Sequence, residues 1–411
     1  MTRKKKISHF AILIAVIAAG IWIATRWHAW FYNPAEEPYT ASAVPSRVLL
    51  TFGNEGEMSR MVSWMCGDVV SSDAALLLAD DKDTVKIKAV GEVFESRSGH
   101  AAYYRAEMKA LKPAMQYSYA VETNGHRSPW YAFHTGNPKA DTFTFMFVGD
   151  VQDTINGIAN RMLRQALRLH PEVEFTAFGG DLIERPADSY YAETFRSIDS
   201  ICTAMPVVNV TGNHDYLKYL VRKCEHRFAL TFPYFLKGQQ ERGDDNHLFS
   251  FAYHGTRFYL LDSNRGIPSL WNQRRWLKEQ TAAARENRQI VIVHHPMYSV
   301  RHKSNNQLQR WMFNDIICDA GVDLVLQGHE HGYARCTSAE SPLRSNVCTT
   351  PPLYTISHCS PKNYRLHPSE RFYPVIPTGR FYQLITVGKA GITMRAYNAA
   401  THALVDSVVI R

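Results

Sequence analysis

The stretch that decides the fold is Ile290-Val291-Ile292-Val293-His294-His295-Pro296, an apolar segment that ends in two histidines. A short run of β-branched apolar residues is typical of a strand that is buried on both faces, as in a parallel sheet. Four other apolar segments also end in Asp, Asn or His close to a glycine: 143–148 before Gly149-Asp150, 175–178 before Gly179-Gly180-Asp181, 206–210 before Gly212-Asn213-His214-Asp215, and 322–326 before Gly328-His329-Glu330-His331.

Helical periodicity separates these strands. We expect helices near 155–167, 189–203, 271–286 and 306–319, and antiparallel strands at 381–387, 392–397 and 403–410. Strands that alternate with helices predict an α/β domain over residues 139–411. The carboxyl ends of its parallel strands should meet at one edge, where such folds bind ligands.

The chain before this domain has a different hydrophobic pattern. Seven short apolar or aromatic segments, separated by Gly, Asp, Asn and Ser, predict a β-sandwich over residues 45–138. Residues 31–44 contain Pro34 and Pro38 and are predicted to be a polar linker.

The basic charge is concentrated at the N-terminus. The chain has 411 residues and a formal net charge of +8. Residues 1–30 hold five of the 46 Lys and Arg and no acid, so the other 41 face 38 acids and leave +3. This excess is too small to indicate a polyanion-binding protein, and we predict no nucleic-acid partner.

Four of the five cations precede an apolar run of 18 residues, 7–24. The run is just long enough to span a bilayer, and the positive-inside rule would leave the rest of the chain outside the cytoplasm. We therefore predict an uncleaved membrane anchor within residues 1–30, with a cleaved signal peptide as the alternative. In either case the location is extracytoplasmic. There disulfides are allowed, and Cys336 and Cys348, which flank a polar loop, are the predicted pair.

The side chains at the strand ends form a set of metal ligands without thiolates. Oxygen and imidazole donors suit Fe, Mn or Zn, as divalent or trivalent ions. Seven donors exceed the needs of one ion, so we expect two ions that share one bridging carboxylate. The predicted ligands are Asp150, Gln152, Asp181, Asn213, His294, His329 and His331.

His214 follows a predicted ligand, so its ring should lie beside the two ions without binding them. This position is typical of a general acid that protonates a leaving group. Asp215 is expected to orient the His214 ring.

The ordered motifs resemble those of calcineurin-like metallophosphoesterases. The segments Met61-Val62-Ser63-Trp64, Leu111-Lys112-Pro113 and Ser128 to Thr135 resemble the fibronectin-III-like N-terminal domain of purple acid phosphatases. The resemblance implies a four-layer catalytic domain of two mixed sheets flanked by helices. It also favours His294 over His295 as the ligand, with His295 lining the site, and places a phosphate-contacting histidine near His302.

Two residues depart from the purple acid phosphatase pattern. Glu184 stands where those enzymes have the tyrosine that ligates ferric iron, and Gln152 stands where they have glycine. The amide oxygen of Gln152 can still bind a metal. These departures leave the identity of the metals open.

The resemblance implies acid phosphatase-like hydrolysis of small phosphate monoesters by a metal-bridging hydroxide, with His214 as the general acid. A phosphodiesterase or pyrophosphatase on the same scaffold is the first alternative. A non-catalytic surface-binding protein, built on the sandwich, is the second.

Overall fold

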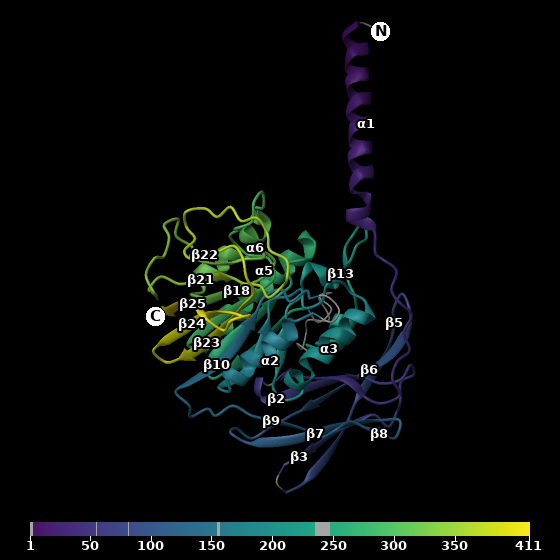
Figure 1. Cartoon of the computed structure of the whole chain (residues 1–411), viewed down its shortest axis with the longest axis vertical. Helices are drawn as coiled ribbons and strands as arrows, with labels where there is room; N and C mark the ends of the chain where they lie inside the picture. The colour runs from purple at the N-terminus through teal and green to yellow at the C-terminus, as the bar shows by residue number, and fades with distance from the viewer. Residues whose placement is uncertain (1–2, 55, 81, 154–156, 235–246) are drawn as a thin grey trace.

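The computed structural model describes residues 3–54, 56–80, 82–153, 157–234 and 247–411. A long helix, α1 (Arg3–Phe31), stands away from a body made of a sandwich and a larger two-sheet domain (Figure 1). No helix within the described part of the chain is both long and apolar enough to cross a membrane. The membrane anchor stays a prediction from the sequence.

The sandwich consists of two antiparallel sheets. Leu76 and Tyr119 of one sheet share a core with Val62 and Tyr104 of the other, because alternate side chains of each strand face inward. One sheet has the order β1 (Ser46–Gly53), β2 (Gly56–Met65), β6 (His100–Met108), β5 (Val90–Glu95). The other has the order β4 (Thr84–Lys88), β3 (Ala75–Ala79), β7 (Gln116–Thr123), β8 (His126–Arg127), with β9 (Tyr131–His134) also paired to β7.

The larger domain contains two seven-stranded mixed sheets. The first has the order β12 (Val207–Asn209), β11 (Val173–Phe178), β10 (Thr142–Val148), β23 (Phe381–Gly388), β24 (Gly391–Asn398), β25 (Leu404–Ile410), β20 (Val347–Cys348). The second has the order β15 (Phe249–Tyr253), β16 (Thr256–Leu261), β17 (Arg288–Val293), β18 (Leu324–Gln327), β21 (Leu353–Ile356), β19 (Tyr333–Thr337), β22 (Val375–Ile376).

Helices complete the four layers. α2 (Ala159–Leu169) and α3 (Asp188–Cys202) contribute to the core of the first sheet, and α5 (Ile267–Ala283) and α6 (Gln307–Asp319) cover the second. Strand β17 shows why its sequence is apolar throughout. Ile290 and Ile292 belong to the core that also contains the first sheet, whereas Val291 and Val293 pack in the cluster formed with α5 and α6. The predicted fold class is confirmed.

Smaller elements follow strand β12 in the chain. These are the 3-10 turn Asn213–Asp215, the hairpin of β13 (Tyr216–Leu217) and β14 (Lys223–Cys224), and the short helix α4 (Arg227–Thr231). Sequence patterns did not indicate β13, β14 or α4, because each is too short to show a period.

The segment predicted as a polar linker is held against the body. The side chain of Glu36 is buried, accepts a hydrogen bond from the backbone N–H of Asp188 at 2.6 Å, and pairs with Arg227 at 3.0 Å. Phe52 of β1 stacks on Phe251 of β15 with ring centroids 4.3 Å apart, so the sandwich and the larger domain also share a core.

The predicted disulfide between Cys336 and Cys348 is wrong. Both cysteines are free and buried. Cys336 lies in β19 of the second sheet, and Cys348 lies in β20 at the edge of the first sheet. Closeness in the sequence does not bring the two thiols together, because the chain changes sheets between them.

Candidate active site

Both sheets of the larger domain contribute to one site. Strands β10, β11 and β12 are parallel, as are β16, β17, β18 and β21. The segments after β10, β11 and β12 bring Asp150, Asp181 and Asn213 to the site. Those after β17 and β18 bring His294, His329 and His331.

Glycines allow the close approach of these segments. A Cβ on Gly212 would lie 2.0 Å from Asp181 Oδ1, and one on Gly328 would lie 2.3 Å from Asp150 Oδ1. Asp181 and His329 have φ values of +48° and +68°. Residues other than glycine rarely adopt this left-handed conformation, and it is characteristic of functional sites where the surrounding fold compensates the strain.

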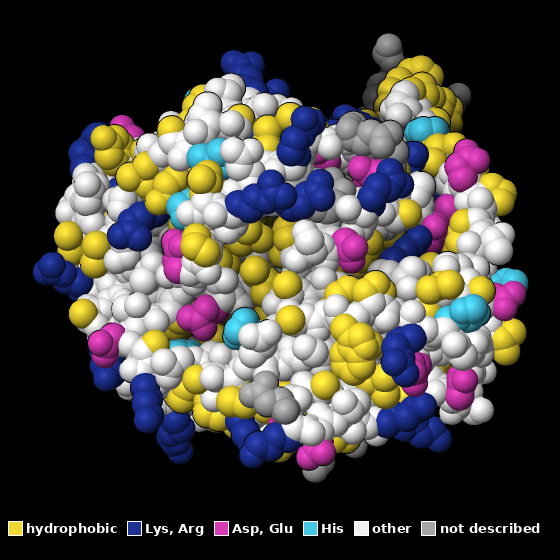
Figure 2. Space-filling model, turned by 60° about the horizontal axis from the view of Figure 1, so that its bottom comes forward, with side chains coloured by type: hydrophobic (Ala, Val, Ile, Leu, Met, Phe, Trp, Pro, Cys, Tyr) yellow, Lys and Arg dark blue, Asp and Glu magenta, His cyan; other side chains and the backbone are white. Residues whose placement is uncertain are grey.

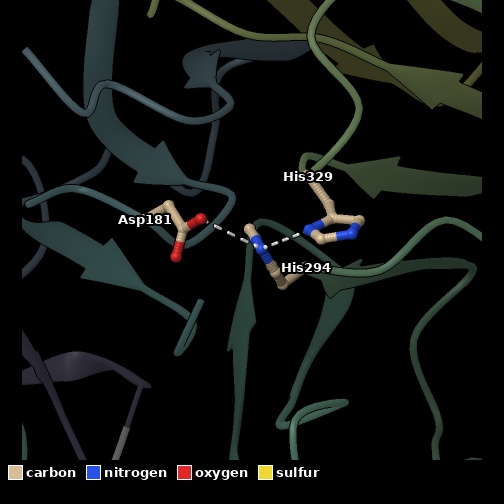
Figure 3. A group of neighbouring side chains, drawn as sticks. All are labelled: Asp181, His294 and His329. Carbon is tan, nitrogen blue, oxygen red and sulfur yellow. Dashed lines mark hydrogen bonds and ion pairs between the residues drawn. The ribbon is translucent and has the colours of Figure 1, made fainter. Parts of the chain in front are cut away.

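Asp181 lies at the centre of the site. Its Oδ1 accepts a hydrogen bond from the backbone N–H of His214 at 2.7 Å. Its Oδ2 lies 3.4 Å from His294 Nε2 and 3.2 Å from Gln152 Nε2. The ligand atoms of Asp181, His294 and His329 all lie within 4.8 Å of one another (Figure 3). This position suits a carboxylate shared between two ions.

The first group of donors beside Asp181 comes from both sheets. His294 Nε2 lies 3.2 Å from Asn213 Oδ1 and 3.2 Å from His329 Nδ1. The other ring nitrogen of His294 donates to the Gly179 carbonyl at 2.9 Å, which leaves Nε2 to act as a ligand.

The second group lies around Asp150. His331 Nε2 is 3.1 Å from Asp150 Oδ2, and His331 Nδ1 donates to the Lys362 carbonyl at 2.9 Å. Gln152 Oε1 is buried and has no hydrogen-bond partner among the described residues. A buried oxygen without a partner is costly, and a metal ion would satisfy it.

Electrostatics also favour a cation here. Burial alone would lower the pKa of His294, but the carboxylates of Asp181 and Asp150 outweigh it and raise that pKa to about 10. Burial would likewise raise the pKa of Asp181, yet His294 and His214 hold it below its usual range. The two carboxylates therefore attract positive charge, and the donor set fits two metal ions.

His214 is beside this group without being part of it. Its Nδ1 donates to the Glu184 carbonyl, and its Nε2 lies 4.0 Å from Asp181 Oδ2. Asp215 accepts a hydrogen bond from the Gly212 N–H at 2.7 Å, and the structure records none between Asp215 and the His214 ring. The Glu184 carbonyl thus holds the imidazole on its Nδ1 side, and the expected role of Asp215 stays a prediction.

The two histidines predicted to line the site differ in position. The ring of His295 lies 4.2 Å from that of His329, and Ser263 Oγ lies 2.9 Å from His295 Nδ1. Burial and the neighbouring His294 lower the pKa of His295 to about 3. The ring of His302 packs against His367, and the described residues give it no contact with the ligands.

Several residues of the site were not predicted from the sequence. Tyr364 stacks on the His331 ring at 4.1 Å, and Lys362 pairs with Glu184 at 2.6 Å. Glu330 is fully buried between two predicted ligands, and its place in the His-x-His motif was the one available signal. Tyr364 and Lys362 lie in an irregular loop that no motif marks.

On the face drawn in Figure 2, Lys and Arg side chains are interspersed with Asp and Glu, and several lie above a central hollow. This arrangement agrees with the small net charge of the chain beyond its first 30 residues.

Comparison with known proteins gives the same architecture. Two purple acid phosphatases of Arabidopsis thaliana, numbers 21 and 22, are each 21% identical to the chain over 56% and 38% of its length. These matches cover 53% and 39% of the relatives, so the chain spans about half of their length or less. A solved structure, "GAP50 the anchor in the inner membrane complex of Plasmodium", has a TM-score of 0.50 and 12% identity. The match covers 66% of this chain and 89% of the solved chain, and it supports the fold.

Family models match both parts of the chain. Residues 45–135 match the N-terminal domain of purple acid phosphatases, and residues 143–333 match the calcineurin-like phosphoesterases. Together these matches cover most of the sequence. The chain thus belongs to the calcineurin-like phosphoesterases, a family of hydrolases, and carries the N-terminal domain of purple acid phosphatases.

Proposed function

We propose that the protein hydrolyses small phosphate monoesters with two metal ions, each Fe, Mn or Zn. The observation that supports this proposal is that seven donor side chains lie in contact with one another around Asp181 and Asp150. Asn213, His294 and His329 would hold one ion together with Asp181. Asp150, Gln152 and His331 would hold the other.

The bound ions would supply Lewis acidity and a hydroxide nucleophile at neutral pH. The chain itself would supply the proton for the leaving group. His214 Nδ1 is committed to the Glu184 carbonyl, so a protonated His214 carries its transferable proton on Nε2, the nitrogen nearer Asp181. From there it can protonate the leaving alkoxide as a general acid.

The test compares Asp181→Ala with Asp319→Ala, which removes an exposed acid from α6. The full chain should hold about two metal ions by elemental analysis and hydrolyse p-nitrophenyl phosphate. It should act more slowly on bis(p-nitrophenyl) phosphate. We expect Asp181→Ala to lose at least one ion and more than about 100-fold in activity. Asp319→Ala should match the parent.

Full activity in Asp181→Ala, or a parent that binds no metal, would contradict the dinuclear site. Faster hydrolysis of the diester would instead favour the phosphodiesterase alternative.

We also propose that the protein works outside the cytoplasm, because Lys4, Lys5 and Lys6 precede the apolar residues of α1. Cell fractionation with an antibody against the full chain tests this location. Recovery in the cytoplasmic fraction alone would contradict it.

A further inference from the structure

The loop after β17 is tied to the metal-ligand turn through Glu330. This carboxylate is fully buried and lies between the two histidines of the His-x-His motif. It accepts four hydrogen bonds, from Ser299 Oγ at 2.6 Å, Val300 N at 2.6 Å, Arg301 N at 3.0 Å and Asn306 Nδ2 at 3.1 Å. The backbone of Arg301 is therefore fixed relative to the predicted ligands.

A stack of four side chains fixes the guanidinium of Arg301 as well. The His358 ring lies parallel to His331 at 5.1 Å, and Tyr364 stacks on His331 at 4.1 Å with an interplanar angle of 11°. The guanidinium carbon of Arg301 lies 4.3 Å from the centroid of Tyr364. This separation leaves no room for it on the face that His331 occupies. Arg301 is thus held one aromatic ring away from a metal ligand.

Arg301 is exposed, and the described residues provide no ion pair for it. Lys362, on the loop that carries Tyr364, differs in this respect, because its Nζ forms an ion pair with Glu184 Oε1 at 2.6 Å. An unpaired, positioned guanidinium at the edge of the site is suited to bind an anion.

We propose that Arg301 binds a second phosphate group of the substrate, beyond the phosphoryl group that is hydrolysed. The intervening Tyr364 ring separates the guanidinium from the ligand atoms, so one phosphate cannot easily serve both. A planar guanidinium matches two phosphate oxygens in a bidentate pair. The substrate class is then a bisphosphate or a phosphoanhydride. This inference rests on the proposed phosphoesterase function.

Calorimetric binding of inorganic phosphate and inorganic pyrophosphate to the metal-loaded full chain tests the inference. We expect Arg301→Gln to weaken pyrophosphate binding at least about tenfold while phosphate binding stays the same. Arg301→Lys should recover part of the loss, because it restores the charge without the bidentate geometry. The matched control is Arg365→Gln, which removes an exposed arginine from the neighbouring segment.

Unchanged pyrophosphate binding in Arg301→Gln would overturn the inference. An equal loss for phosphate and pyrophosphate would overturn it too, because it would place Arg301 on the first phosphate. An equal loss of pyrophosphate binding in Arg365→Gln would overturn it as well, because the effect would then come from the general surface charge. If the wild-type protein hydrolysed no ester, the proposed function would fail. The ratio of the pyrophosphate affinity to the phosphate affinity would still test the role of Arg301.

Discussion

At the scale of single residues, His214 shows how one side chain obtains a defined role. Its Nδ1 is bound by the Glu184 carbonyl, so its Nε2 faces Asp181. The side chain of Glu184 pairs with Lys362, whose carbonyl in turn accepts the Nδ1–H of His331. One ion pair therefore joins the backbone partners of the proposed general acid and of a proposed ligand. Glu184, which stands in place of a tyrosine ligand, has a positioning role here.

We predict that His214→Asn slows the hydrolysis of an alkyl phosphate by about 10²–10⁴-fold in kcat. The loss should be much smaller with p-nitrophenyl phosphate, because p-nitrophenolate leaves without needing a proton. Steady-state kinetics with both esters checks this, and KM should change little. Equal losses for the two esters would argue against His214 as the proton donor.

At the scale of elements, the ends of the strands position the ligands through close backbone packing. Strand β10 ends at Val148, and an added Cβ on the next residue, Gly149, would lie 1.8 Å from the Ser357 carbonyl oxygen. Cys359 donates its N–H to the Asp150 carbonyl at 2.9 Å, so the segment after β21 runs directly beside the first motif. The position of Asp150 thus depends on a segment of the second sheet, about 200 residues later in the chain.

We expect Gly149→Ala to displace this segment, lower the free energy of unfolding by about 1–3 kcal/mol and reduce metal content. The steric overlap involves backbone atoms that cannot rotate away. Gly266→Ala is the control, since its Cβ would meet only Pro268 at 3.9 Å, and it should change stability by less than about 0.5 kcal/mol. Thermal unfolding and elemental analysis measure the two effects. Normal metal content in Gly149→Ala would contradict this account.

At the scale of the whole molecule, a buried group of charges joins the sandwich, the segment after α1 and the catalytic domain. Arg47 of β1 makes two hydrogen bonds of 2.8 Å with Asp188 of α3. Arg227 is fully buried and pairs with Glu36 at 3.0 Å and with Glu225 at 3.5 Å. If one part unfolded alone, the charges left in the other parts would lose their buried partners, so the parts should unfold together.

The pH dependence of stability tests this group. Burial raises the pKa of Glu225 to about 7, although Arg227 opposes the shift. The folded protein then binds a proton more tightly than the unfolded chain, whose glutamate pKa is 4.5. The stabilising effect is complete below about pH 4.5 and is lost as the pH rises to about 7.

We predict that Glu225→Gln raises the melting temperature at pH 8 and has little effect at pH 5, because glutamine resembles the protonated acid. Glu340→Gln, at an exposed position, should change neither value. Calorimetric scans at both pH values measure the difference. A Glu225→Gln protein that is less stable at pH 8 would show that the ion pair with Arg227 outweighs the burial of charge.

The sequence alone determined the layers of this protein and the chemistry of its ligands. Uninterrupted apolar strands such as 290–293 are typical of strands buried on both faces, and Asp, Asn and His supply donor atoms that suit metal ions where several of them meet. Both properties are local, so they can be read from a few adjacent residues.

Only the tertiary structure decided which residues meet. Asn213 and His294 come from different sheets, and Arg301 rather than His302 reaches the stack on His331. The Glu184–Lys362 pair joins residues 178 positions apart. Such contacts depend on the packing of the two sheets and on irregular loops, where no period in the sequence specifies the direction of a side chain.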